Sequence, residues 1–283
     1  MSGGVGTDAS AVRARHAAVF RPYYRQHGRA LAVLLLAVAL WLYGASAMEV
    51  SGARLLNGIG ELGRIVGLML PPDPGSVAAV LVFAKALAET LAIALLGTLG
   101  AAVIAFPLGF LAARNTTVSL ILRFFARRSF DTLRGVDILI WALVWINVVG
   151  LGPFAGVLAL ISSDVGSFGK LFSEAIEAAD QKAVEGVLST GGSRSAALRF
   201  GIVPQLLPVW LSQVLYFFES NTRSASIIGI VGAGGVGLVL SEQIRTLEFG
   251  QMSFMIGLIW LTVSLIDLAC SRLRFAVIGT RAL

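Results

Sequence analysis

Five uncharged stretches of 18 or more residues constrain this 283-residue chain more than any other feature of its sequence. Each is apolar and long enough to cross the hydrocarbon core of a bilayer as one helix. Charged residues make up 13% of the chain, about half the fraction typical of a soluble protein. The chain is therefore predicted to be an all-α polytopic membrane protein, which excludes a soluble enzyme, a nucleic-acid binder and a secreted scaffold. The stretches are 30–48, 90–113, 138–163, 200–218 and 249–266, with a glycine-rich sixth at 224–241.

These stretches and the turn residues between them predict about six transmembrane helices. Pro107 should kink the second helix, because a proline inside a helix removes one of its hydrogen bonds. A short helix at the membrane surface is expected within 49–75, where Pro71, Pro72 and Pro74 end it. The transmembrane helices are expected at about 29–48, 77–113, 133–149, 153–172, 203–220 and 251–271.

The chain is expected to divide into four parts along its length. They are a basic arm (1–28), the first transmembrane helix with an extracytoplasmic surface segment (29–75), a core transmembrane domain (76–275) and a tail (276–283). The arginines of the arm and the sequence Ala45-Ser46-Ala47 also fit a cleaved signal peptide. An uncleaved helix is preferred, because the apolar stretch of 19 residues is longer than the roughly 7–15 of a signal peptide.

The 22 Lys and Arg residues predict the orientation of the chain in the cell membrane. With the N-terminus in the cytoplasm, 17 of them fall on the cytoplasmic side, Arg274 included, and five fall on the other side. Cytoplasmic loops carry the excess of basic residues in membrane proteins. Both termini are therefore expected in the cytoplasm, with an even number of spans, so that 224–241 does not cross completely. The five outer residues are Arg54, Arg64, Lys85, Arg223 and Arg245.

The sequence lacks the residue sets of several kinds of active site. No G-x-x-x-x-G-K-[ST] motif is present, so the chain is not expected to bind nucleotide phosphates by itself. One cysteine, Cys270, and two histidines, His16 and His27, argue against a disulfide framework, a zinc site and a catalytic triad. We therefore expect no cofactor, metal or catalytic residue, and energy for uphill transport would come from an ion gradient or a separate subunit.

A charged stretch at 173–200 separates the fourth and fifth expected transmembrane helices. Residues 173–186 are rich in Ala and Glu and predict a helix, and Gly191-Gly192 breaks the pattern. Ser193 is a candidate N-cap of the next helical turn. The residues alone leave two interpretations open, which are a solvated helical hairpin and a rigid projection that docks a partner.

Three residues of this stretch and its continuation match a known spacing. Glu185, Gly191 and Pro204 are spaced as in the loop typical of ABC importer permeases, although Gly186 and Gly201 depart from its pattern. The wider sequence over about 86–275 resembles the phosphonate permease branch of this family. The segments that carry the resemblance are 150–159, 185–192, 203–208, 218–226 and 229–237.

The resemblance implies a type I ABC importer permease architecture and a set of partners. A second copy of the chain would complete a dimer, and two cytoplasmic ATP-binding subunits would dock on 173–200 through Glu185, Gly186, Gly191 and Pro204. An extracytoplasmic binding protein would deliver phosphonate or a related phosphorus oxyanion, which would cross by alternating access. A permease for another small solute such as methionine, or a secondary transporter working alone, is the alternative.

Polar residues after the fifth apolar stretch are candidates for the substrate path. An ionisable group at membrane depth costs roughly 2.5–3.5 kcal/mol and is a functional hypothesis by default. Glu219, Asn221 and Arg223 mark either the outer end of the fifth helix or, with Ser224 and Ser226, the translocation path. In the second interpretation Arg223 donates paired hydrogen bonds to a phosphonate oxygen and pairs with Glu219 when the path is empty.

The glycine-rich stretch also has two interpretations. Five glycines fall within 229–237, which permits either close helix packing or an unwound backbone that protein or water must cover. A re-entrant gate or an element at the dimer axis, which includes Gly232, Gly234 and Gly235, is the interpretation that we favour. Glu89 and Asp267 are expected to be interfacial or paired near the ends of their helices.

Overall fold

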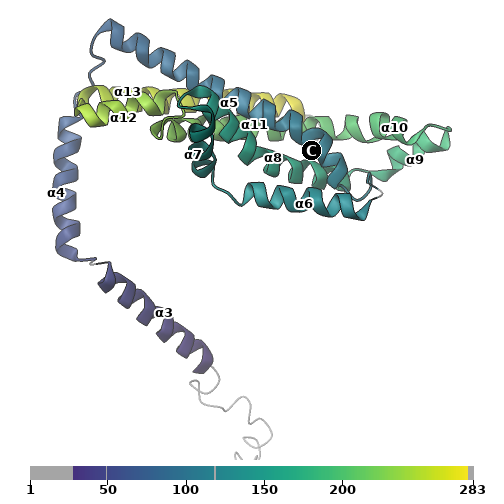
Figure 1. Cartoon of the computed structure of the whole chain (residues 1–283), viewed down its shortest axis with the longest axis horizontal. Helices are drawn as coiled ribbons and strands as arrows, with labels where there is room; N and C mark the ends of the chain where they lie inside the picture. The colour runs from purple at the N-terminus through teal and green to yellow at the C-terminus, as the bar shows by residue number, and fades with distance from the viewer. Residues whose placement is uncertain (1–27, 49, 118, 280–283) are drawn as a thin grey trace, which may run out of the picture. The chain divides into compact units, whose positions relative to one another are not determined.

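The computed structural model describes residues 28–48, 50–117 and 119–279, and these residues are almost entirely helical (Figure 1). Most of the basic arm, both histidines and the end of the tail lie outside the described residues. The helices are α3 (Gly28–Ala47), α4 (Gly52–Leu68), α5 (Val77–Ala112), α6 (Leu120–Arg134), α7 (Ile138–Val149), α8 (Pro153–Ala178), α9 (Gln181–Ser189), α10 (Arg194–Ala196), the π-helix η1 (Ala197–Ile202), α11 (Val203–Ile230), α12 (Val236–Thr246) and α13 (Phe249–Ile278).

The described chain divides into two compact units between Ile65 and Val66. In the first unit, α3 coincides with the first expected transmembrane helix and leaves its apolar residues uncovered. Helix α4 ends at Leu68, just before the prolines that were expected to end it, and none of its residues is buried.

Five of the described helices are long and apolar enough to span a membrane, and the count rises to six if α6 and α7 form one broken span. The single spans are α3, α5, α8, the continuous segment from Arg194 to Ile230, and α13. The prediction of an all-α membrane protein with about six spans is therefore confirmed.

The core of the second unit lies between α5, α8 and α11, which run alongside one another in Figure 1. Helix α5 approaches α8 closely because Gly97 has no side chain: a Cβ atom there would lie 2.5 Å from Cβ of Leu160. An aromatic cluster joins α8 to α11, with ring centroids 5.7 Å apart for Phe172 and Trp210 and 4.4 Å apart for Phe168 and Phe217.

Two predicted helix boundaries are wrong, and capping residues account for both. The third transmembrane helix was expected to begin near Leu133, but α6 ends at Arg134 and α7 begins at Ile138 after a bend of 91°. The Asp137 side chain accepts a hydrogen bond from the backbone N–H of Leu139 and starts the new helix there. The helix expected over 173–186 is likewise divided at Asp180, whose side chain caps α9.

The later helices extend beyond the uncharged stretches that predicted them. Helix α11 was expected to end near residue 220 and continues to Ile230, and α13 continues to Ile278 rather than to about 271. The glycine-rich stretch is divided between the end of α11, a turn at 231–235 and the start of α12. Pro107 lies inside α5, and the helix continues past it to Ala112.

Candidate functional site

The segment 180–202, called the hairpin below, folds back on itself through α9, α10 and η1. Helix α9 ends in a Schellman motif: the N–H of Gly192 donates to the carbonyl of Val187 and the N–H of Gly191 to that of Leu188. Gly191 takes the left-handed conformation that this motif requires, with φ of +81°. Ser193 then caps α10 by accepting a hydrogen bond from the N–H of Ala196, as predicted.

The two arms of the hairpin touch because of a glycine that departs from the expected loop pattern. A Cβ atom on Gly201 would lie 3.2 Å from both the nitrogen and the Cα atom of Val184. Any larger residue would push η1 away from α9, so Gly201 sets the distance between the arms.

A single side chain fastens the base of the hairpin to α11. The Gln205 amide accepts a hydrogen bond from the N–H of Asp180 at 3.1 Å and donates to the carbonyl of the same residue at 3.2 Å. It also donates to the carbonyl of Gly201 at 2.6 Å. The start of α9, the end of η1 and the first turn of α11 are therefore held together.

The outer surface of the hairpin carries the residues that were singled out in the sequence. Glu185, Gly186, Gly191 and Pro204 are all exposed, and nothing lies within 4 Å of the position that a Cβ on Gly186 would take. Within the part of the chain that the structure describes, the carboxylate of Glu185 has no hydrogen bond or ion pair. It is therefore available to a partner.

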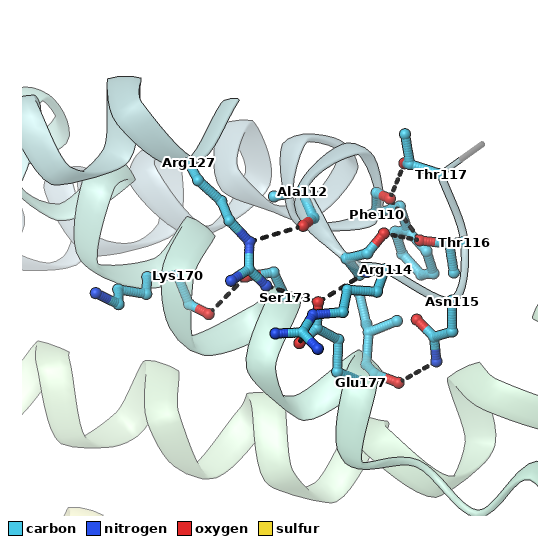
Figure 2. Close-up of polar contacts among 12 residues, drawn as sticks. Phe110, Ala112, Arg114, Asn115, Thr116, Thr117, Arg127, Lys170, Ser173 and Glu177 are labelled. Carbon is cyan, nitrogen blue, oxygen red and sulfur yellow. Dashed lines mark hydrogen bonds and ion pairs between the residues drawn. The ribbon is translucent and has the colours of Figure 1, made fainter. Parts of the chain in front are cut away.

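Beside the hairpin, a clamp around Glu177 joins α5, α6 and α8 (Figure 2). Its carboxylate accepts a hydrogen bond from Arg127 on α6 at 2.6 Å and another from the backbone N–H of Arg114 at 2.7 Å. Arg127 donates in addition to the carbonyl of Ala112, and Asn115 donates to that of Ile176. The clamp fixes the segment after α5 against the last turn of α8.

Further along α11, Glu219 accepts hydrogen bonds from two arginines. Arg274 of α13 lies 2.7 Å from one carboxylate oxygen, and Arg223, one turn along α11, lies 3.4 Å from the other. The charge count had placed Arg223 and Arg274 on opposite sides of the membrane. One of these two assignments is wrong, because both guanidinium groups contact the same carboxylate.

Asn221 lies inside the bundle rather than on an open path. Its amide donates to the hydroxyl of Thr98 on α5 at 2.9 Å and to the carboxylate of Asp164 on α8. All three residues are buried. Asn221 therefore joins α11 to two other helices in this conformation. The hydroxyl groups of Ser224 and Ser226 donate to carbonyls of their own helix, at Ser220 and Thr222.

The glycine-rich turn is packed against α5 and the start of α8. Gly232, Gly234 and Gly235 are buried and all have positive φ, between +71° and +104°. A Cβ on Gly234 would lie 2.7 Å from the Glu89 carboxylate, and one on Gly235 would lie 2.5 Å from the Thr90 hydroxyl. Glu89 is therefore paired, as expected, and its partner is the backbone N–H of Gly235. Glu89 lies well inside α5 rather than near the end of the helix.

The sequence matches a described family over most of this bundle. The profile of the binding-protein-dependent transport system inner membrane component matches residues 105–274. The chain belongs to this family. It is the permease component of an ABC importer and an inner membrane protein.

Curated relatives of this permease carry names that refer to phosphorus oxyanions. The putative phosphite transport system permease protein HtxC of Stutzerimonas stutzeri is 37% identical over 257 residues, which cover 91% of this chain and 89% of the relative. The phosphite transport system permease protein PtxC of the same organism is 32% identical and covers 89% and 90%. The phosphate-import permease protein PhnE of Mycolicibacterium smegmatis is 32% identical over 82% of this chain and 43% of the relative.

Solved structures support the expected type I importer permease fold. The MetNI methionine ABC transporter in inward-facing conformations aligns with a TM-score of 0.62 at 19% identity, over 72% of this chain and 99% of the other. At this identity the likeness shows the fold of the permease, and the resemblance expected from the sequence is confirmed at that level.

Several residues that shape the site were not identified from the permease sequence. Arg274 was counted as a flanking cytoplasmic charge, and Asp164, Glu177 and Gln205 were given no role. Each acts through a partner at least 25 residues away, which no local spacing reveals. Among the described residues, no group of three or more His, Cys, Asp or Glu could hold a metal ion.

Proposed function

We propose that this permease forms half of the translocation path of an importer for phosphonates or related phosphorus oxyanions. The observation that carries the proposal is the similarity to HtxC, a protein named as a putative phosphite transport system permease, over nine-tenths of both chains. The sequence has no G-x-x-x-x-G-K-[ST] motif, and in this proposal separate ATP-binding subunits supply the energy.

The hairpin is the docking site for an ATP-binding subunit in this proposal. Glu185 and Gly186 lie exposed on α9, and Gln205 ties the base of the hairpin to α11. A force on the hairpin is therefore transmitted into α11 as a rigid body, which suits the domain motions of alternating access. Gly191 and Pro204 keep the two ends of the docking surface in place.

The substrate path lies along the uncovered face of α11. Arg223 shares this face with Val209, Tyr216 and Ile230, which follow at intervals of seven residues and are 41%, 54% and 46% exposed. The Arg223 side chain is 48% exposed and can donate paired hydrogen bonds to an oxyanion. The buried turn with Gly232, Gly234 and Gly235 forms the gate at the end of this face. Ser224 and Ser226 lie between Arg223 and this turn along the chain.

A second permease chain completes the path, and we propose that it is a second copy of this one. The uncovered apolar and polar face of α11 supports such a pairing. Stutzerimonas stutzeri has two relatives named as putative phosphite permease proteins, HtxC and HtxE, so a heterodimer is the competing arrangement. Co-purification of two differently tagged copies separates the two arrangements.

The deciding experiment is reconstitution of the permease with its ATP-binding subunit and its extracytoplasmic binding protein in liposomes. Stimulation of ATP hydrolysis and uptake by methylphosphonate or phosphite is the expected result. An assembled complex that responds to methionine or another solute would keep the architecture and discard the substrate class. Failure of the ATP-binding subunit to bind would refute the docking role of the hairpin.

A further inference from the structure

Glu219 is a buried carboxylate between two guanidinium groups that differ in exposure and in their distance from it. Its side chain is 11% exposed, that of Arg274 is 26% exposed and that of Arg223 is 48% exposed. The contact with Arg274 has the short distance of a charge-assisted hydrogen bond, whereas the two contacts with Arg223, at 3.4 and 3.5 Å, are longer than ordinary N–H···O bonds. Arg274 is held firmly and Arg223 loosely.

Both arginines keep donors that Glu219 does not use. A guanidinium group has five N–H donors, and only three nitrogen atoms of the pair contact Glu219. The structure gives neither group a further hydrogen bond or ion pair among the described residues. Two guanidinium groups and one carboxylate also leave the cluster with a net charge of +1.

We infer that Arg274 and Arg223 together form the oxyanion-binding site of the path, with Glu219 as the counterion that holds them when no substrate is present. This inference rests on the proposed function and adds to it a second binding residue from a different helix. A phosphonate or phosphite monoanion neutralises the excess charge of the cluster, which favours its binding in a poorly solvated site. Arg223 turns toward the anion first, because its bonds to Glu219 are the weaker ones.

A simpler role for Arg274 is to neutralise Glu219 and fasten α13 to α11. The two roles differ in what happens when Glu219 is made neutral as well. If Arg274 only neutralises Glu219, Arg274→Gln is harmful because it leaves the buried carboxylate with only its long contacts to Arg223, and Glu219→Gln removes that harm. If Arg274 binds the substrate, the double variant stays as defective as Arg274→Gln alone.

The test uses the full complex in liposomes, with phosphite or methylphosphonate loaded on the binding protein. The variants are Arg274→Gln, Glu219→Gln and the double variant, and the control is Arg272→Gln, an exposed residue on the same helix. We measure substrate taken up per ATP hydrolysed. This ratio separates binding from packing, because a loosened helix contact lowers uptake and hydrolysis together.

We expect Arg274→Gln and the double variant to lower uptake per ATP at least tenfold, while Arg272→Gln stays within twofold of the parent protein. Recovery of the double variant to the level of Glu219→Gln overturns the inference. If Arg274→Gln fails to assemble, Arg274→Lys keeps the charge but loses the paired donors. Full uptake by Arg274→Lys would then overturn it. An unaltered complex that takes up no phosphorus oxyanion refutes the proposed function itself.

Discussion

The backbone N–H of Gly235 donates a 2.8 Å hydrogen bond to the carboxylate of Glu89, 146 residues earlier in the chain. The next N–H, that of Val236, donates to the hydroxyl of Thr90 at 2.7 Å. Two adjacent side chains of α5 thus cap the first turn of α12, and the negative charge of Glu89 lies at the positive end of that helix. The gate of the proposed path is fastened to α5 by this contact.

Replacing Glu89 tests the contact. Glu89→Ala leaves the N–H of Gly235 without its acceptor and is expected to cost about 1–3 kcal/mol of stability. Glu89→Gln keeps an acceptor oxygen and should cost less. The melting temperature of the purified protein in detergent measures both, and equal losses for the two variants would show that the charge rather than the hydrogen bond holds the turn.

The close approach of α5 to α8 predicts that Gly97 tolerates no side chain. A methyl group there overlaps Leu160, so Gly97→Ala should destabilise the protein by about 1–3 kcal/mol through overpacking. Gly257 on α13 is the matched control, because nothing lies within 4 Å of its Cβ position. Gly257→Ala should leave the melting temperature unchanged or raise it, and a similar drop in both variants would mean that the Leu160 contact is unimportant.

The clamp predicts that Arg127 stabilises the bundle through Glu177. Arg127→Ala removes a hydrogen bond to the Glu177 carboxylate. Such a bond contributes about 1.5–3 kcal/mol to stability when both partners are shielded from water. The loss should be smaller here, because the Arg127 side chain is 36% exposed. Arg123→Ala is the matched control, because the Arg123 side chain, on the same helix, has no hydrogen bond or ion pair among the described residues. Limited proteolysis of the segment after α5 should be faster only in Arg127→Ala, and equal cleavage in the two variants would contradict the prediction.

Two variants of the hairpin test the proposed docking of the ATP-binding subunit, one by removing a contact residue and one by distorting the hairpin. Glu185→Ala should weaken binding of the ATP-binding subunit several-fold without changing the melting temperature, because the Glu185 side chain has no partner among the residues that the structure describes. Gly191→Ala strains a left-handed backbone by about 1–2 kcal/mol and should weaken binding by distorting the hairpin. Co-purification on a sizing column measures both, and an intact complex with Glu185→Ala would refute the docking role.

Arg223 is expected to be essential for uptake and dispensable for folding. Its side chain is half exposed and makes only long contacts, so Arg223→Ala should leave assembly and melting temperature within error. Uptake should fall at least tenfold, because the oxyanion loses a paired donor. Normal uptake by a fully assembled Arg223→Ala complex would remove this residue from the path.

Local sequence determined the parts of the structure that depend on neighbours along the chain. Apolar length predicted α3 and α5, and the turn at 191–193 followed from two glycines and a serine, since solvent preference and capping act within a few residues. The spacing of Glu185, Gly191 and Pro204, together with the wider segments between 150 and 237, predicted the family from the order of residues along the chain alone.

The tertiary structure decided which charged groups a helix can carry and where it ends. A charge marks the end of a predicted span because an unpaired ion is costly in lipid, and this reasoning ended α11 ten residues too early. Glu219 remains inside the helix because Arg274 of α13 neutralises it, and Glu89 because it caps α12. Pairing between residues far apart in the chain removes the cost, and only the folded arrangement of helices brings such residues together.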